Sequence, residues 1–224
     1  LPCSEGGGMI FPASTEFGLR MPKQKFYEKL ELSAALKRAF VEQIKLMRWT
    51  HKLSAATMNT APGQNVQEIE VIRIWLTGPE LDEGVLRVID RNIPYHILFL
   101  LEYEGRVQAW IGWKELANGK LAGKPGQSWH TAWMPEEDLP LCIDGLDLDT
   151  IYENFIRQIA GEGLSAPQSV PLKQRIELSA QKEKLRKKMD ALEKKMLKER
   201  QPWRQSEMYD ELRKLRNEYE ALEA

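Results

Sequence analysis

The spacing of apolar and polar positions predicts alternating helices and strands over residues 33–159. Apolar residues three and four apart follow Ser33, a good N-cap, and predict a helix that fades near Ser54. The β-branched and aromatic run of residues 66–76 predicts a strand. Further helices are expected after Pro79 and over residues 147–159, whereas residues 9–32 have the composition of a loop.

Residues 95–113 carry the clearest pattern, two apolar runs on either side of Glu104-Gly105. A tight turn there would pair Leu98 with Ile111 and Phe99 with Trp110. Apolar residues would then lie on both faces, which predicts a central hairpin covered on both sides. Residues 114–127 contain four glycines and prolines and are expected to form a long loop, and residues 128–134 a further strand.

The C-terminal residues 172–224 change character and show heptad spacing. Two apolar runs surround a break at Pro202, which predicts an antiparallel helical hairpin with a coiled-coil seam. The first helix is basic and the second acidic, so opposite charges would flank that seam. The predicted seam residues are Leu178, Leu185, Met189, Leu192, Met196, Met208, Leu212, Leu215, Tyr219 and Leu222.

Together these elements predict an α+β fold: an antiparallel or mixed sheet with about three helices, followed by the C-terminal antiparallel helical hairpin, a coiled coil. Residues 1–8 read as a leader or cloning remnant and residues 9–160 as the α+β domain. Residues 161–171 have the composition of a linker, and residues 172–224 form the hairpin.

The formal charge of −1, from 32 basic and 33 acidic residues, hides strong segregation. Residues 20–52 hold nine basic and three acidic residues, whereas residues 53–164 hold 8 basic and 17 acidic. The net charge therefore excludes no phosphate partner. Nucleic-acid-binding candidates in the basic segment are Lys23, Lys25, Arg38, Lys45 and Arg48. The alternative is a solvated basic face, or one that docks on the acidic segment of the same chain.

The sequence contains no recognisable cofactor-binding or metal-ligand motif. The two cysteines and three histidines lack zinc spacing, so no metal or cofactor is expected. No apolar run reaches the roughly 18 residues of a membrane span, and no secretory signal is evident, so we expect a cytoplasmic protein with reduced cysteines. The clustered tryptophans are best explained by core packing, because their segment is acidic.

Weak candidates for a metal-dependent nuclease are the carboxylates Glu68, Glu70 and Glu102. Such a site also needs a lysine, and the predicted hairpin puts Lys114 about 23 Å from Glu102. Surface carboxylates are therefore the preferred interpretation, and no catalytic residue is assigned.

Several stretches resemble an uncharacterised bacterial family, the domain-of-unknown-function family 4391. They are Ser14-Thr-Glu-Phe17, Pro22-Lys-Gln-Lys-Phe-Tyr27, residues 93–105 (IPYHILFLLEYEG) and residues 151–159 (IYENFIRQI). The resemblance covers about residues 9–160 and extends into the tail, where Pro202-Trp203 departs from the more usual Phe-Asn. It implies no established activity, but family members tend to lie near helicases and DNA methyltransferases in loci that resemble restriction–modification or phage defence.

These observations favour a non-enzymatic accessory or interaction subunit of a bacterial antiviral-defence or restriction–modification-like assembly. The coiled tail would bind a protein partner, such as a helicase or DNA methyltransferase of the same locus, or form a homodimer. One alternative is a DNA-binding module that uses residues 20–52, and another is a divergent metal-dependent nuclease. No membrane partner is expected.

Overall fold

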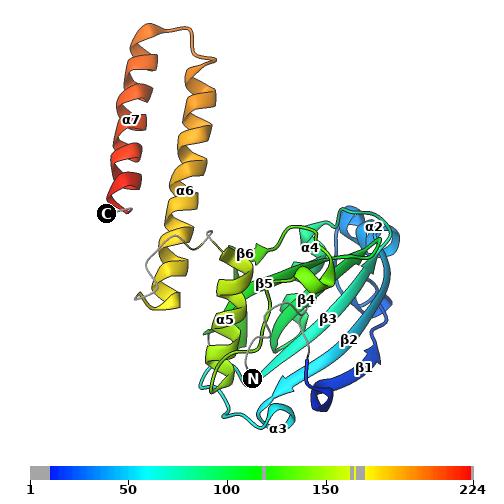
Figure 1. Ribbon diagram of the computed structural model, residues 1–224. Helices are drawn as coiled ribbons and strands as arrows, with labels where there is room; N and C mark the ends of the chain where they lie inside the picture. Colours follow the sequence, from blue (N-terminus) through cyan, green and yellow to red (C-terminus); the bar gives the residue numbers. More distant parts are fainter. Residues whose placement is uncertain (1–10, 118–119, 162–163, 165–169, 223–224) are drawn as a thin grey trace. The chain divides into compact units, whose positions relative to one another are not determined.

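The computed structural model describes residues 11–117, 120–161, 164 and 170–222 (Figure 1). The chain divides into two compact units, residues 1–161 and 162–224, and each is described by itself. The described part of the first unit contains a six-stranded sheet in the order β1-β2-β3-β4-β5-β6. The strands are β1 Glu16–Arg20, β2 Ile44–Ser54, β3 Glu68–Leu76, β4 His96–Tyr103, β5 Arg106–Ala117 and β6 Lys120–His130.

The sheet is mixed, since β3 and β4 are parallel and the other neighbouring strands are antiparallel. The parallel pair is joined by helix α4, Glu83–Asn92, as a parallel connection requires. Asp82 caps this helix by accepting a hydrogen bond from the Gly84 N–H, 2.7 Å away. The predicted α+β class is confirmed, with the sheet of the mixed kind.

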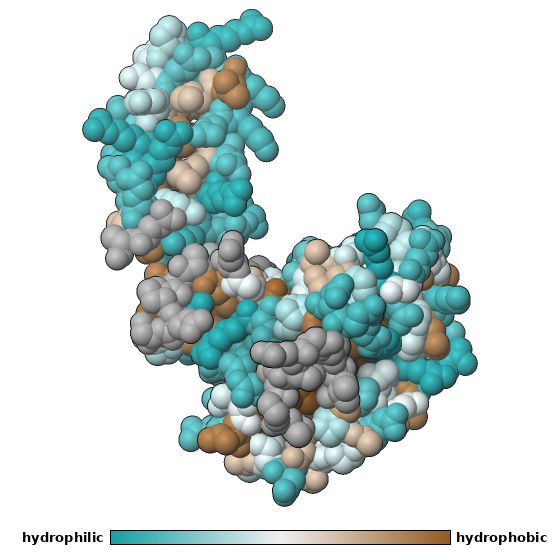
Figure 2. Space-filling model, viewed as in Figure 1, coloured by the Kyte–Doolittle hydropathy of each residue, from teal (hydrophilic) through white to brown (hydrophobic). Residues whose placement is uncertain are grey.

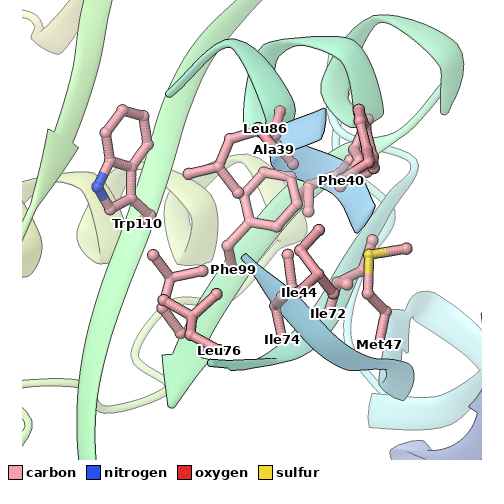
Figure 3. Packing of buried hydrophobic residues seen from close by; sticks show 14 residues of the cluster. Ala39, Phe40, Ile44, Met47, Ile72, Ile74, Leu76, Leu86, Phe99 and Trp110 are labelled. Atoms are coloured by element: carbon pink, nitrogen blue, oxygen red, sulfur yellow. The ribbon is translucent and has the colours of Figure 1, made fainter. Parts of the chain in front are cut away.

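Side-chain alternation gives the sheet two apolar faces. On one face, Ile72 and Phe99 occupy paired positions and pack with α4 and with helix α2, Ala34–Glu42 (Figure 3). On the other, His96 lies 4.4 Å from Tyr152 of helix α5, Leu148–Ala160 (ring centroids). The core therefore consists of one apolar layer on each side of β3 and β4.

The prediction of one helix from Ser33 to about Ser54 was wrong beyond residue 42. Helix α2 ends at Glu42, and strand β2 begins at Ile44. In β2, Met47 pairs with Ile74 and Trp49 with Ile72, so the apolar residues face the core as strand residues. The apolar residues after residue 42 continue the helical spacing of α2 only by coincidence. Pairing with β3 determines that this segment forms a strand.

The predicted hairpin of residues 95–113 is confirmed, with Leu98 opposite Ile111 and Phe99 opposite Trp110. Glu104 and Gly105 both have positive φ, 47° and 75°, as a type I′ turn requires. The long loop expected over residues 114–127 was wrong, because β5 and β6 continue through it as a second hairpin. Strand β6 is an edge strand whose register with β5 shifts between Gly112 and Lys114, and edge strands and irregularities accept proline and glycine. The strand expected over residues 128–134 ends at His130.

Segments predicted as loops contain short elements. Strand β1 lies within residues 9–32, which were expected to be irregular, and it forms one edge of the sheet. The same segment also contains η1 Ala13–Thr15 and α1 Gln24–Tyr27. Two more short elements, α3 Ala55–Met58 and η2 Glu136–Asp138, lie where no element was predicted. Short elements of this kind carry too few residues for a periodic pattern.

The second unit holds a helical pair, α6 Leu172–Met196 and α7 Pro202–Ala221, which pack side by side (Figure 1). Pro202 occupies the first turn of α7, where a missing N–H has no cost. Across the pair, Arg216 contacts Glu193 at 2.9 Å, and the Lys182 amine lies 5.9 Å from the Tyr219 ring centroid. In the described part of the chain, Glu207, Glu211 and Glu218 form no ion pair with α6.

None of the helices that the structure describes has the length and apolar character that a bilayer crossing needs.

Candidate functional site

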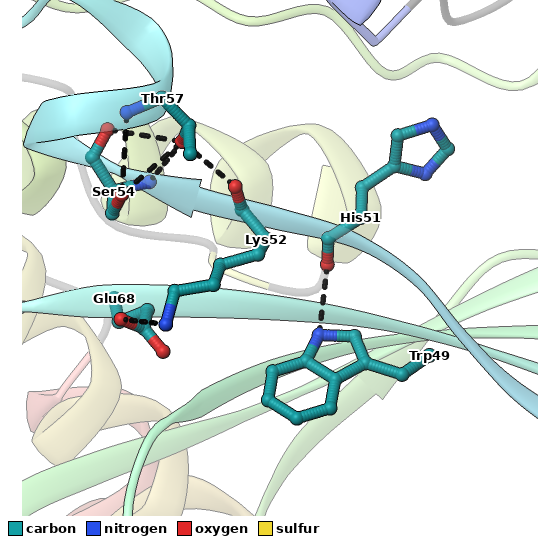
Figure 4. A network of polar contacts seen from close by, with 6 residues as sticks. All are labelled: Trp49, His51, Lys52, Ser54, Thr57 and Glu68. Carbon is teal, nitrogen blue, oxygen red and sulfur yellow. Dashed lines mark hydrogen bonds and ion pairs between the residues drawn. The ribbon is translucent and has the colours of Figure 1, made fainter. Parts of the chain in front are cut away.

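A lysine and two glutamates meet on adjacent strands of the first unit. Lys52 lies on β2, directly across from Glu70 on β3, and Glu68 is two positions before Glu70 on the same face. The Lys52 amine lies 2.8 Å from Oε2 of Glu68 (Figure 4). Glu70 is only 1% exposed, whereas the Glu68 and Lys52 side chains are 13% and 32% exposed. We call these three residues the acid–lysine cluster.

Three carboxylate oxygens of the acid–lysine cluster are buried without a hydrogen-bond donor among the described residues: Oε1 of Glu68 and both oxygens of Glu70. Burial first, and then the contact with Glu68, raises the pKa of Glu70 to about 9. Lys52 and the Trp49 indole oppose this shift. Glu70 therefore carries a proton at neutral pH, which it can donate to Glu68.

The polar contacts around this cluster come from the end of β2. The Trp49 indole N–H donates to the His51 carbonyl at 3.1 Å (Figure 4). Ser54 and Thr57 form a capping box that begins α3. These contacts hold the strand end that carries Lys52.

The structure separates the three weak nuclease candidates. Glu68 and Glu70 lie together, but Glu102 is on the opposite face of the sheet, where it contacts Arg73 at 3.1 Å. Arg73 also binds Glu136, which further neutralises that region. Glu102 is thus part of a separate ion-pair group.

Lys114, the lysine weighed for a nuclease site, has a structural role. Its amine contacts Asp90 at 2.8 Å and donates to the Tyr95 carbonyl at 2.6 Å, so it closes the C-terminal end of α4. Burial lowers the pKa of Lys114 and raises that of Asp90. Lys52 is the lysine that lies beside Glu68 and Glu70. The sequence did not predict this neighbour, because the apolar spacing of residues 44–54 predicts a helix and not strand β2.

The histidines do not assemble a metal site. Burial lowers the pKa of His96 to about 4, so its ring is neutral against Tyr152. Within the described ranges, no three His, Cys, Asp or Glu side chains are grouped as metal ligands. Cys142, expected to be a reduced thiol, is in a disulfide.

The basic segment of residues 20–52 contributes to a pocket at the β1–β2 edge. Arg20, Lys23 and Lys45 line this pocket of about 270 Å³, and no acidic residue is among the described residues that line it. The Lys23 amine donates to the carbonyls of Val41 and Ile44 at 2.8 and 2.6 Å, which fixes its position at the end of α2. We call these three residues the basic pocket.

The remaining candidates of that segment lie elsewhere. Arg48 is the register partner of Arg20 on β1 and of Arg73 on β3. Lys25 is exposed on α1 and Arg38 on α2, and neither lines the pocket. The structure thus brings Lys23 and Lys45 together and adds Arg20, which the sequence analysis did not single out.

The tryptophan-rich segment packs into the protein. Trp110 is 8% exposed and stacks on His130 with ring centroids 5.5 Å apart. Both rings line a pocket of about 340 Å³ whose rim includes Glu80 and Glu83. These carboxylates would repel nucleic-acid phosphates, which agrees with the packing interpretation.

The seam of the helical pair is only partly covered. Leu212 is buried at 3% exposure, and the other predicted seam residues are half-buried. Three large apolar side chains are more exposed: Leu197 at 82%, Trp203 at 58% and Tyr209 at 58%. Figure 2 shows apolar residues along the pair with hydrophilic residues on both sides.

These features define a two-unit α+β protein: the first unit has a mixed sheet that carries one buried and one half-buried glutamate, and the second is a helical pair. The family model described as Domain of unknown function (DUF4391) matches residues 9–218, so the chain belongs to this family. Neither the curated proteins nor the solved structures contain a match.

Proposed function

We propose that this protein is a non-enzymatic accessory subunit of a bacterial antiviral-defence or restriction–modification-like assembly, and that the α6–α7 pair binds its protein partner. The observation that carries the proposal is the apolar surface that this pair leaves exposed, both in its half-buried seam and at Leu197, Trp203 and Tyr209 outside the seam. The genomic setting expected for the family supports the kind of assembly and the kind of partner, a helicase or DNA methyltransferase of the same locus.

Two helices alone bury little apolar surface. An exposed leucine that becomes fully buried contributes about 1.5–3 kcal/mol, so a partner that covers the exposed apolar side chains of the pair gains binding free energy. Leu197, Trp203 and Tyr209 are the most exposed large apolar side chains of this unit. Aromatic anchors of this kind dominate the energies of protein interfaces.

The charge of α6 suits an acidic partner surface. Its 25 residues include nine basic and four acidic side chains. In the described part of the chain, Lys184, Arg186 and Lys188 have no ion pair. Such charges add association rate and orientation to an apolar contact.

The test compares the full-length chain with a Leu197→Ser/Tyr209→Ser variant by size exclusion with light scattering, alone and with the neighbouring helicase. Both positions are exposed, so folding should be retained, and helicase binding should weaken by at least tenfold. A matched control is Leu146→Ser in the first unit, whose side chain is 90% exposed. A chain that ends at Gly163 should also fail to bind.

Unchanged binding by both altered chains would contradict the proposal. If the chain self-associates through the same residues and ignores the helicase, its partner is a second copy.

A second candidate function is binding of a nucleic-acid backbone at the basic pocket. The observation that favours it is the convergence of Arg20, Lys23 and Lys45 on one pocket of about 270 Å³ with no acidic residue described in its lining. Removal of one phosphate-binding side chain should reduce the slope of log affinity against log salt by about 0.7–0.9.

The double variant Arg20→Gln/Lys45→Gln should therefore weaken DNA binding and flatten its salt dependence. Lys25→Gln, outside the pocket, is the control. This function would be ruled out if the wild type showed no DNA binding at about 50 mM salt. It would also be ruled out if Arg20→Gln/Lys45→Gln and Lys25→Gln bound DNA equally well.

A further inference from the structure

We propose that the pocket between the start of α4 and the sheet binds an arginine side chain of a partner protein. This inference concerns the first unit and is independent of the proposed interaction through α6 and α7. It starts from the cavity of about 340 Å³ that Trp110 and His130 line, which the proposed function does not use. Ligand pockets measure roughly 300–1,000 Å³, so this cavity suits a ligand as small as one side chain.

Aromatic rings form part of the pocket lining. Trp110 on β5 and His130 at the end of β6 stack with ring centroids 5.5 Å apart, and Trp133 follows β6 and also lines the pocket. Indole is the aromatic group that attracts cations most strongly, through the negative face of its ring system. In the described part of the chain, no lysine or arginine lies over Trp110 or Trp133, so no cation of the chain itself uses these indoles.

Carboxylates supply the complementary charge. Glu80 and Glu83 are exposed on the rim, and no lysine or arginine is among the described residues that line the pocket. Glu83 contacts Arg87 at 3.1 Å, whereas Glu80 forms no ion pair with any described residue. The positive N-terminal end of α4 is already compensated by the capping carboxylate of Asp82. The pocket therefore attracts a cation, and Glu80 is the carboxylate that remains for it.

Gln108 adds a hydrogen-bond acceptor to the lining. Its amide nitrogen donates to the Thr131 carbonyl at 2.8 Å and lies 3.2 Å from Nδ1 of His130. Because both contacts involve the nitrogen, the carbonyl oxygen of this amide is left to accept from a ligand. A guanidinium has five N–H donors in a planar fork, so it can bind this oxygen and a carboxylate together.

The apolar part of the lining favours an arginine on a peptide chain. Leu81, Leu86 and Leu101 line the pocket beside the rings, and the methylene stem of an arginine packs well on such side chains. The planar guanidinium also stacks on aromatic rings and pairs with a carboxylate through two parallel N–H groups. A lysine ammonium is a compact and strongly hydrated charge, so it should gain less from the same surroundings.

The test follows the indole N–H signals of the ¹⁵N-labelled full-length chain by NMR while the peptide acetyl-Gly-Arg-Gly-amide is added. The signals of Trp110 and Trp133 should shift saturably. The same peptide with citrulline, the neutral isostere of arginine, should bind at least about tenfold more weakly, because it loses the charge-assisted contacts. The lysine peptide and methylguanidinium, which lacks the stem, should also bind more weakly than the arginine peptide.

Glu80→Lys should weaken binding of the arginine peptide by at least about tenfold, because it places a like charge beside the guanidinium. Glu80 is exposed, so the variant should fold. Glu104→Lys makes the same change of charge at an exposed turn position outside the pocket lining, and it should bind the peptide like the wild type.

Any of four results would overturn the site. The first three are no saturable shift of the two indole signals, equal affinity for the citrulline and arginine peptides, and equal affinity of Glu80→Lys and Glu104→Lys. The fourth is binding of methylguanidinium as tight as that of the arginine peptide, which would make the ligand a small guanidinium compound and not a protein side chain.

Discussion

Lys52 is the cross-strand partner of Glu70, yet its amine binds Glu68, 2.8 Å away, and leaves Glu70 without an ion pair. The buried glutamate is therefore neutral at pH 7, because its pKa is raised to about 9.

The free energy of unfolding of this protein should fall as pH rises because of Glu70. The folded-state pKa of about 9 lies above the ordinary value of 4.5, so between these values the folded chain holds a proton that the unfolded chain has lost. The free energy of unfolding then falls by at most about 1.4 kcal/mol per pH unit. Glu70→Gln should flatten this slope, as urea titrations at several pH values would show. A slope equal to that of the wild type would show that Glu70 is ionised.

His96 should act in the opposite direction at low pH. Its folded-state pKa of about 4 lies below the ordinary value of 6.5, so the unfolded chain binds the proton first as pH falls. Stability contributed by the neutral ring is complete above about pH 6.5 and is lost between there and pH 4. His96→Phe, which keeps a ring against Tyr152, should reduce the acid sensitivity. The effect is measured as the difference between the urea midpoints at pH 7 and pH 5. A difference that is the same in the wild type and in His96→Phe would contradict the prediction.

Lys114→Met should strongly destabilise the first unit. The change leaves the Asp90 carboxyl largely buried without its cation and frees the Tyr95 carbonyl, to which the amine now donates at 2.6 Å. Loss of one member of a buried ion pair costs about 3–5 kcal/mol. Adding Asp90→Asn should recover part of the loss, as a double-mutant cycle would show. The exposed Lys187→Met should change stability by less than about 0.5 kcal/mol.

Gly63 should not tolerate a side chain. A Cβ there would lie 2.3 Å from Oδ1 of Asp149, and that carboxylate accepts the Val66 and Gln64 N–H groups at 2.7 and 2.8 Å. Gly63→Ala must displace this contact, at about 1–3 kcal/mol. Gly78 has nothing within 4 Å of the same added atom, so Gly78→Ala is the matched control. Equal unfolding midpoints for Gly63→Ala and Gly78→Ala would contradict this prediction, because they would show that the segment around Gly63 accommodates the added Cβ without cost.

The sequence predicted those parts of the fold where local pattern and long-range packing agree. The Leu98–Ile111 register followed from the Glu104-Gly105 turn, because turn chemistry determines pairing in a short hairpin. Residues 44–54 were misassigned, because their apolar spacing fits a helix until the partner strand is known. That error also concealed Lys52 as the neighbour of Glu68.

The basic pocket also could not be predicted from the local sequence pattern. Lys23 and Lys45 are 22 positions apart, and only the edge pairing of β1 with β2 brings them to one pocket with Arg20. Strand β1 has five residues, all exposed, and therefore shows no alternation of buried and exposed positions. Contacts of this kind depend on tertiary structure that a local pattern does not contain.

The proposed role of the α6–α7 pair is tested most directly by quantitative co-purification of the tagged protein from its native host. The wild type should retain a helicase or methyltransferase encoded in the same locus in near-equimolar amount. Leu197→Ser/Tyr209→Ser should lose it, and Leu146→Ser, an exposed position of the first unit, should not. Equal recovery of that protein with all three chains, or its absence from the wild-type sample, would contradict the account.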